Sequence, residues 1–491
     1  MSGPSMDTPH PAGGAEAASS LPHVVVLGAG PAGLGAAYRL AKTGVARATV
    51  IEQRDAVGGN AGSFSIAGIT ADYGSHRLHP ECAPEVLADL RRLIGEDLVL
   101  RRRHGRIRLR DRWVHFPLKP LDLALHLPPP FAAGALRDAL LRPLRRTPPD
   151  TRTFADVMER NLGPAICQDF YFPYARKIWG IGPEELSPVQ AQKRVSANSP
   201  AKLLRKALGA VPGLGATSSR SFYYPRRGYG QISQCLYEAG QHLGVSYLLG
   251  TRVTGVERSG SQAVGVWTEA ENGPRQVKAD HVWSTLPMPL LARLMQPAAP
   301  SDVLTAASQM EFRAMVLVYI VLATPQFTPF DAHYFPEEHI PVSRLSEPKN
   351  YSMTGQPSGK TVLCAELPCA PDSEIWAADG ATLGGLVKDA LRAAGLPVDV
   401  PVLDVVAHKL RYAYPVYRLG FEQHFDVIDR WLGTINGLLT FGRQGLFAHD
   451  NAHHALDMAY SAVQCLLPDG TFDRERWGRF RVAFEANVVV D

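Results

Sequence analysis

The chain has 491 residues, of which 45% are hydrophobic and 20% are charged, and its formal net charge is +4. This composition is ordinary for globular proteins and excludes collagen-like, coiled-coil and wholly disordered chains. The small net charge gives no reason to expect nucleic-acid binding. Apolar runs such as residues 315–323 are far shorter than the roughly 18 residues that a membrane span requires, so we expect no transmembrane segment.

The six cysteines are scattered, with no CxxC pair and no zinc-ligand spacing. We therefore expect reduced thiols, no metal site and a cytoplasmic location. Residues 1–20 are rich in Pro, Gly, Ala and Ser, which predicts a disordered tail. This tail lacks the basic start and apolar core of a signal peptide.

A strand, a glycine-rich turn, a helix and a second strand are predicted over residues 21–52. Gly28, Gly30 and Gly33 form a GxGxxG pattern, and Glu52 follows 19 residues after the last glycine. The first glycine permits a tight turn, the second lets the backbone approach a pyrophosphate, and the third allows close helix–strand packing. The acidic residue accepts hydrogen bonds from ribose hydroxyls. The segment therefore predicts a dinucleotide site at a helix N-terminus.

Later elements alternate between helical and extended patterns. Helices are predicted over residues 84–98 and 131–145, and residues 153–210 are mostly helical with proline breaks. Strands return after Phe222. We expect strands over residues 246–249, 263–268, 281–284, 315–322, 402–410 and 439–441, and helices over residues 381–395 and 455–466.

Two further segments resemble flavoproteins of the amine-oxidase superfamily. The run from Gly58 to Ala61 follows Glu52 closely and resembles the glycine pair of that superfamily. The turn at residues 439–445 resembles its second flavin segment, in which the final helix points its N-terminus at the flavin ring. The resemblance implies FAD as the cofactor. It implies FAD contacts by Gly28, Gly30, Gly33, Glu52, Gly59, Asn60, Ala61, Val253, Gly442 and Arg443.

Six short blocks between residues 22 and 467 resemble one branch of this superfamily, UDP-galactopyranose mutase, especially its eukaryotic type. The blocks are DYGSHR at 72–77, WVHFPLK at 113–119, PYARKIW at 173–179, YFPEE at 334–338, Tyr-Pro at 414–415 and GRQG at 442–445. The resemblance implies catalytic roles for Arg194 and Arg344, which would hold a diphosphate, and for His76, which would orient the flavin or its loop. It implies substrate contacts by Phe116, Lys119, Trp179, Tyr334, Tyr414 and His449.

The reaction that this resemblance implies acts on a nucleoside-diphosphate sugar. N5 of the reduced flavin attacks the anomeric carbon, and NADH or NADPH is a candidate reductant. The sequence also departs from the mutase pattern, because Ala175 replaces an asparagine, Phe116 and His449 replace tyrosines, and Lys119 replaces a glutamine. The diphosphate contacts are mostly kept while the base and sugar contacts differ, which leaves the substrate open.

Two other functions share the same glycine motifs. One is a redox flavoenzyme, an oxidase or desaturase of an amine, a porphyrinogen or an isoprenoid. The other is a flavin-binding protein without chemistry. An apolar tunnel lined by aromatics would favour the redox enzyme, whereas an arginine-lined cleft would favour the mutase. The arginine-rich stretches at 101–112 and 142–147 predict a solvated charged face or the steering of an anionic substrate.

The predicted architecture is an α/β fold with a discontinuous, Rossmann-like FAD-binding domain. This domain takes residues 21–90, 222–290 and 436–491. A helical insertion takes residues 91–221, and a mostly antiparallel substrate-binding sheet takes residues 291–435. We expect the substrate cleft between these parts. The oligomeric state stays open.

Overall fold

The computed structural model describes residues 21–117, 119, 122, 125–141, 152–194, 221–355 and 357–489. The predicted tail at residues 1–20 and the basic stretch at 142–147 lie outside these ranges. The side chains of Ala139 and Arg194 also lie outside the described part.

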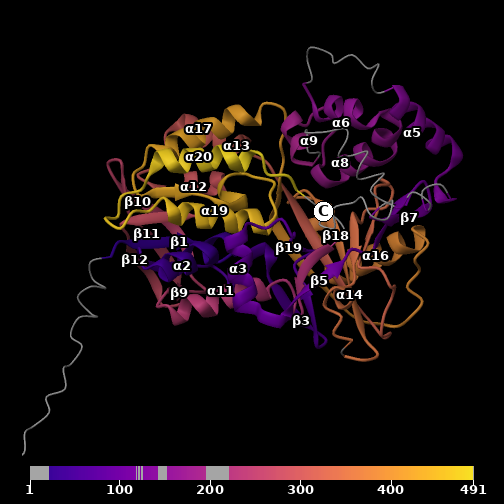
Figure 1. Cartoon of the computed structure of the whole chain (residues 1–491), viewed down its shortest axis with the longest axis horizontal. Helices are drawn as coiled ribbons and strands as arrows, with labels where there is room; N and C mark the ends of the chain where they lie inside the picture. The colour runs from indigo at the N-terminus through magenta and orange to yellow at the C-terminus, as the bar shows by residue number, and fades with distance from the viewer. Residues whose placement is uncertain are drawn as a thin grey trace, which may run out of the picture.

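A five-stranded parallel sheet forms one half of the molecule, on the left in Figure 1, with the strand order β20–β13–β1–β2–β9. The strands are β1 (His23–Leu27), β2 (Arg47–Ile51), β9 (Ser246–Leu248), β13 (His281–Ser284) and β20 (Leu438–Thr440). Val24 and Val26 belong to one hydrophobic core, and Val25 and Leu27 belong to the core on the other face. Because successive side chains of a strand point to opposite faces, the apolar run of β1 is buried on both sides.

Helices cover one face of this sheet. They are α2 (Pro31–Thr43), α3 (Pro84–Ile94), α11 (Gln231–His242), α19 (Ala452–Gln464) and α20 (Arg474–Glu485). Helix α2 packs against both α11 and α19, which lie far from it in sequence. The predicted helix at 84–98 ends earlier than expected, because Gly95 adopts φ 64° after Ile94 and the chain then turns into a strand.

The other face carries a four-stranded sheet and three helices. The sheet comprises β10 (Arg252–Ser259), β11 (Gln262–Ala270), β12 (Gly273–Lys278) and β14 (Met295–Gln296). The helices are α12 (Met288–Leu294), α13 (Ser301–Gln309) and α17 (Phe421–Gly433). Two small antiparallel pairs lie elsewhere: β3 (Ser63–Ile66) with β4 (Ile69–Asp72), and β5 (Leu98–Arg102) with β8 (Ser221–Pro225).

A seven-stranded, mostly antiparallel sheet forms the second half of the molecule, with the order β19–β15–β18–β17–β16–β6–β7. Its strands are β6 (Gly105–Leu109), β7 (Arg112–Phe116), β15 (Phe312–Leu322), β16 (Ala332–Tyr334), β17 (Arg344–Ser346), β18 (Thr361–Cys369) and β19 (Val402–Pro415). Short or covering helices are α14 (Pro348–Ser352), α15 (Glu374–Ala377) and α16 (Gly380–Ala393). Residues 105–116 fall in the predicted helical insertion but pair with this sheet through β6 and β16.

A helical unit lies above the seven-stranded sheet in Figure 1. It contains α5 (Pro129–Leu141), α6 (Phe154–Leu162), α7 (Pro164–Ile166), a π-helical turn (Cys167–Tyr171), α8 (Phe172–Trp179) and α9 (Pro188–Arg194). The predicted fold class, a Rossmann-like α/β unit with a mostly antiparallel sheet, is confirmed. The division into domains stays a prediction. None of the helices in the described ranges combines the length and apolar composition needed to cross a membrane.

Candidate active site

The glycine turn between β1 and α2 has the geometry that its three glycines predict. Gly28 adopts φ 100°, and a Cβ on Gly33 would lie 1.9 Å from the carbonyl oxygen of Gly28. Gly33 is therefore required for the packing of α2 on the strand. A Cβ on Gly30 would meet nothing within 4 Å. Gly30 thus borders open space at the N-terminus of α2, where a phosphate group would be favoured.

The carboxylate of Glu52 is buried beside this turn. Its two oxygens accept hydrogen bonds from the backbone N–H of Ala29 at 2.9 Å and of Arg54 at 3.0 Å. A carboxylate offers about four acceptor positions, so these bonds fix its orientation and leave acceptors for ribose hydroxyls. The carbonyl of Glu52 accepts from Thr251 N–H at 2.8 Å, and Val253 follows two residues later on β10.

The two flavin-like segments meet although they lie near opposite ends of the chain. The side chains of Asn60 and Gln444 both donate to the carbonyl of Tyr412, at 3.0 and 2.7 Å. Gly442 opens α18 (Gly442–Gly445) at φ 78°, and a Cβ there would lie 2.8 Å from the Cβ of Ala32 on α2.

The glycine pair also lies close to the dinucleotide turn. A Cβ on Gly59 would lie 3.2 Å from the Cα of Gly30, and Ala61 is buried in the same core. Arg443 donates to the carbonyls of Ala413 at 2.9 Å and Asp450 at 2.7 Å. The open space at Gly30, the acceptors of Glu52 and these converging loops fit an FAD.

The N-terminus of α19 carries a buried histidine that the sequence interpretation missed. His453 is 4% exposed, and its Nδ1 has no hydrogen-bond partner within the described part of the chain. Burial, together with the neighbouring His454 and His79, lowers the pKa of His453 to about 2. His453 is therefore neutral in the folded protein at physiological pH.

This histidine predicts a loss of stability in mild acid. Below pH 6.5 the unfolded chain protonates His453 while the folded chain does not, so unfolding becomes easier as the pH falls toward 2. Between pH 7.5 and 5.0 this one group costs about 2 kcal/mol of unfolding free energy. Urea unfolding at both pH values should show that His453→Gln loses about 2 kcal/mol less than the wild type. An equal loss in the two proteins would contradict the prediction.

His76 lies in the loop that follows β4. Its Nε2 lies 3.0 Å from the carbonyl oxygen of Asn60 and 2.9 Å from that of Tyr73, and its ring stacks on Tyr229 at 5.2 Å. Because carbonyls only accept, Nε2 donates its proton to them. Burial lowers the pKa of His76, although the nearby Asp72 opposes the shift. A neutral His76 therefore fixes the loop that joins Asn60 to Tyr73.

A buried carboxylate joins this loop to the seven-stranded sheet. Glu366 on β18 is 2% exposed and accepts from the backbone N–H of Ser75 at 2.9 Å and from Nε of Arg344 at 2.9 Å. Tyr334 and Arg344 are direct partners across β16 and β17, with the guanidinium carbon 6.0 Å from the tyrosine ring. The structure therefore brings Tyr334 and Arg344 together, and Glu366 connects Arg344 to the loop that contains His76.

Arg77 extends this network and was not among the predicted site residues. Its guanidinium donates to the hydroxyls of Tyr334 at 3.0 Å and Tyr351 at 2.9 Å, and the hydroxyls of Tyr351 and Ser75 lie 2.6 Å apart. Burial acts to lower the pKa of Arg77, but the two tyrosines outweigh it and raise that pKa, so Arg77 stays cationic. A sequence signal existed for Glu366, because a lone acid in the apolar run of β18 needs a buried partner.

A second group of predicted residues lies beside α8 and α9. The ring of His449 lies 5.3 Å from Tyr414 and 6.2 Å from Trp179, and its Nδ1 lies 3.2 Å from the side-chain nitrogen of Gln190. The guanidinium of Arg443 lies over the ring of Tyr414 at 5.2 Å. The structure thus brings Trp179, Tyr414 and His449 together with the second flavin segment.

The remaining predicted site residues differ in how they are placed. Phe116 packs edge-on against Tyr334, with ring centroids 5.4 Å apart, whereas Lys119 is exposed. Arg194 is the last residue of α9, and its side chain lies outside the described part. Lys177 on α8 donates to the backbone carbonyls of residues 335, 337 and 342. It therefore fixes the segment after β16.

The expected solvated arginine face is wrong for part of the stretch at 101–112. Arg108 is 6% exposed and pairs with Glu337 at 3.0 Å and Asp111 at 2.7 Å. Arg106 lies over the rings of Trp113 at 4.1 Å and Phe330 at 4.6 Å. Glu337 and Phe330 belong to distant segments of the chain, so these two contacts could not be foreseen from the sequence.

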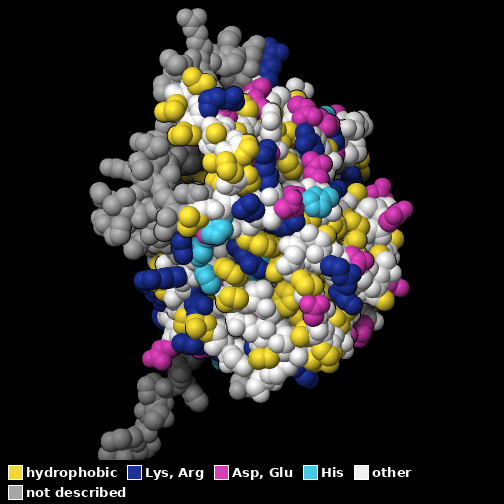
Figure 2. Space-filling model, turned by 90° about the vertical axis from the view of Figure 1, so that its right-hand side faces the viewer, with side chains coloured by type: hydrophobic (Ala, Val, Ile, Leu, Met, Phe, Trp, Pro, Cys, Tyr) yellow, Lys and Arg dark blue, Asp and Glu magenta, His cyan; other side chains and the backbone are white. Residues whose placement is uncertain are grey.

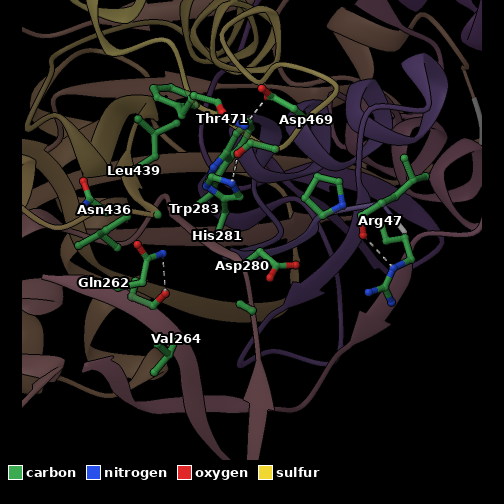
Figure 3. A pocket seen from close by; sticks show the side chains of 18 of the residues that line it. Arg47, Gln262, Val264, Asp280, His281, Trp283, Asn436, Leu439, Asp469 and Thr471 are labelled. Atoms are coloured by element: carbon green, nitrogen blue, oxygen red, sulfur yellow. Dashed lines mark hydrogen bonds between the residues drawn. The ribbon is translucent and has the colours of Figure 1, made fainter. Parts of the chain in front are cut away.

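A cavity of about 850 Å³ lies away from these residues (Figure 3). Arg47, His281 and Leu438 line it, and they begin β2, β13 and β20. The cavity is therefore at the amino ends of the parallel strands, opposite the glycine turn. None of the predicted site residues that the structure describes lines it. A smaller cavity includes Ser75, His76 and Tyr351 and belongs to the network described above.

Comparison with known proteins gives the same cofactor class. A family model described as flavin containing amine oxidoreductase matches residues 31–423. A phytoene dehydrogenase from Streptomyces griseus is 27% identical over 321 residues, and this match spans 56% of each chain. The structure is similar to reduced UDP-galactopyranose mutase, with a TM-score of 0.78, 22% identity and coverage of 94% of this chain and 97% of the mutase. It is also similar to putrescine oxidase bound to putrescine, with a TM-score of 0.60, 17% identity and coverage of 90% and 98%.

Proposed function

The chain belongs to the flavin-containing amine oxidoreductase family, and from this premise we propose an FAD-dependent enzyme that acts on a nucleoside-diphosphate sugar, as a UDP-galactopyranose mutase does. The observation that carries the proposal is the Tyr334–Arg344 pair, which Glu366 joins to the loop of His76. This pair offers a planar cation and a neutral hydroxyl donor, a combination suited to a diphosphate. Bound reduced flavin would supply the nucleophile for the anomeric carbon.

Arg344 acts in this proposal by holding the leaving diphosphate. Its ion pair with Glu366 fixes the guanidinium plane, so little reorganisation is needed when charge develops on the leaving group. Glu366 also neutralises Arg344 electrically. The two negative charges of a diphosphate therefore require further cations, and Arg77, Arg194 and Arg443 are the candidates.

The second group of residues, beside α8 and α9, would border the substrate on the side opposite Arg344. Trp179, Tyr414 and His449 lie beside the turn that carries Arg443. Trp179 and His449 are almost fully buried, so they would exclude water from the reacting centre. His76 would keep the cofactor loop in one orientation through its bonds to Asn60 and Tyr73.

A redox flavoenzyme is the second candidate, and one observation favours it. Tyr334 and Phe116 belong to an apolar cluster with Ile107, Phe170 and Tyr174. Such an aromatic lining would also suit an apolar substrate, as in an oxidase or desaturase. The guanidinium donors of Arg344 and the cation at Arg77 make the anionic substrate the stronger proposal.

Anaerobic turnover by the purified, FAD-loaded protein separates the two candidates. The protein is reduced with dithionite, NADH or NADPH and given UDP-, dTDP- and GDP-sugars, and the products are identified by mass spectrometry. We expect an isomerised sugar nucleotide that forms only with reduced protein and consumes no electrons. No product with any sugar, together with rapid reoxidation by oxygen, would reject the mutase proposal and favour the redox enzyme.

A further inference from the structure

Arg77 holds two tyrosine hydroxyls that come from different elements. One belongs to Tyr334 on β16, at 3.0 Å, and the other belongs to Tyr351 on α14, at 2.9 Å. The guanidinium carbon also lies 5.3 Å from the ring centroids of both Phe222 and Tyr351, so aromatic rings pack against the planar group. A guanidinium carries N–H donors and no acceptor, so the tyrosine oxygen accepts in both bonds.

The two hydroxyl protons differ in the acceptors that lie within reach. The hydroxyl oxygens of Tyr351 and Ser75 are 2.6 Å apart, so Tyr351 has a neighbour inside the protein that can accept its proton. In the described part of the chain, the hydroxyl of Tyr334 has Arg77 as its one hydrogen-bond partner. Because the Tyr334 oxygen already accepts from a cation, its proton points away from Arg77 and is available to an oxygen of a ligand.

The charges around Tyr334 favour an anion as that acceptor. At the surface, basic and acidic side chains are interspersed, as Figure 2 shows for one face of the molecule. Around Tyr334, burial and the charge of the nearby Arg344 both act to lower the pKa of Arg77. Glu366 pairs with Arg344, whereas Arg77 forms no ion pair with any described residue, and it only partly opposes the rise that burial causes in the pKa of Asp331. A further negative charge would therefore stabilise the two guanidinium groups.

We propose that Arg77 is a positioning residue, which orients the hydroxyl proton of Tyr334 toward the diphosphate of the substrate. The charge of Arg77 acts on the diphosphate through this hydroxyl. The bond from a cation also makes Tyr334 a stronger donor, because successive hydrogen bonds polarise one another. Tyr334 then binds the diphosphate beside Arg344 and stabilises the charge that develops as it leaves. This inference rests on the proposed function and adds the residue that sets the direction of the Tyr334 donor.

Binding of nucleoside diphosphates to the oxidised, FAD-loaded protein tests the inference. The probes are UDP, dTDP and GDP, and calorimetric titration gives their dissociation constants. Arg77→Met keeps apolar volume but removes every donor, and it should weaken binding of the tightest probe about tenfold, the effect of one hydrogen bond to a charged group. Tyr334→Phe should weaken binding to a similar extent. The double variant should bind within about threefold of the weaker single variant, because both changes remove the same bond.

Arg91→Met is the matched control. Arg91 on α3 is exposed, donates to the hydroxyl of Tyr223 at 2.6 Å and lies over that ring at 5.3 Å, so the control removes the same kind of contact outside the candidate site. This variant should bind the probe as the wild type does. Arg77→Lys keeps a cationic donor without the planar fork, and it should recover part of the affinity that Arg77→Met loses.

Every variant must keep the bound-FAD absorbance spectrum of the wild type. Should Arg77→Met lose it, Arg77→Gln takes its place, because the shorter side chain cannot reach both hydroxyls. Unchanged affinity in this variant, equal weakening by Arg91→Met, or a double variant whose effect is the product of the two single effects overturns the inference and leaves the proposed function standing. A wild type that binds none of the three probes would instead overturn the proposed function, and this inference with it.

Discussion

Replacing Arg344 with alanine should lower turnover by about 10²- to 10³-fold, the cost of removing one preorganised donor to a developing negative charge. The same change leaves Glu366 buried without its cation, which should cost about 3–5 kcal/mol of unfolding free energy. Turnover of the reduced protein and urea unfolding measure the two effects separately.

A second variant distinguishes catalysis from folding. In Arg344→Ala/Glu366→Gln the buried carboxylate is neutral, so most of the lost unfolding free energy should return while turnover stays low. Arg344→Lys keeps the charge but not the planar fork and should recover only part of the activity. Near-wild-type turnover in the alanine variant would remove Arg344 from the proposed site.

Replacing Gly30 with valine should prevent FAD binding while leaving the fold intact. The backbone of Gly30 has φ −77°, which any residue can adopt, and its Cβ position meets nothing within 4 Å. The added methyl groups would occupy the space expected for the pyrophosphate. We expect an affinity for FAD at least about 100-fold weaker, since both the close backbone approach and the helix N-terminus would be blocked. Flavin content per chain and far-ultraviolet circular dichroism check the two halves of the prediction.

Gly33→Ala is the matched comparison, because it adds one carbon to the same turn. That carbon would lie 1.9 Å from the carbonyl oxygen of Gly28, so α2 must move away from β1. This variant should lose folded protein together with the flavin. Normal flavin content in Gly30→Val would show that the cofactor does not pass this turn.

The parts of the fold that were predicted depend on local sequence. The glycine turn was predictable because its requirements are local: Gly28 adopts φ 100°, and a Cβ on Gly33 would clash with the carbonyl oxygen of Gly28. Residues 106–110 alternate arginines with apolar side chains, as a strand does, but the partner of this strand β6 could not be predicted, since the paired residues Gly105 and Ala332 lie far apart in the sequence. Pairing between such distant segments depends on the assembled sheet and leaves no local pattern.

In the candidate site, too, some residues could be predicted from the sequence and others could not. Tyr334 and Arg344 were expected together from the mutase-like blocks, and their cross-strand pairing explains why ten residues separate them. Arg77 was missed because its role depends on tyrosines that are distant in sequence, whereas Glu366 was missed although its place in an apolar run was a signal. The bonds of Lys177 to three carbonyls after β16 could not be foreseen either, because they depend on a turn that the sequence does not specify.

The strand order of the parallel sheet also determines when this sheet can form during translation. β1 pairs with β13, and β13 pairs with β20, so the sheet is complete only after residue 440 has been made. At about 5–20 residues per second, β1 leaves the ribosome roughly 20–80 seconds before β20 is translated. During that time the apolar residues of β1 and the glycine turn have no finished sheet to join. Until the second flavin segment has been made, a growing chain cannot hold FAD through both of its flavin segments, so we expect stable cofactor binding only after residue 445 has been translated.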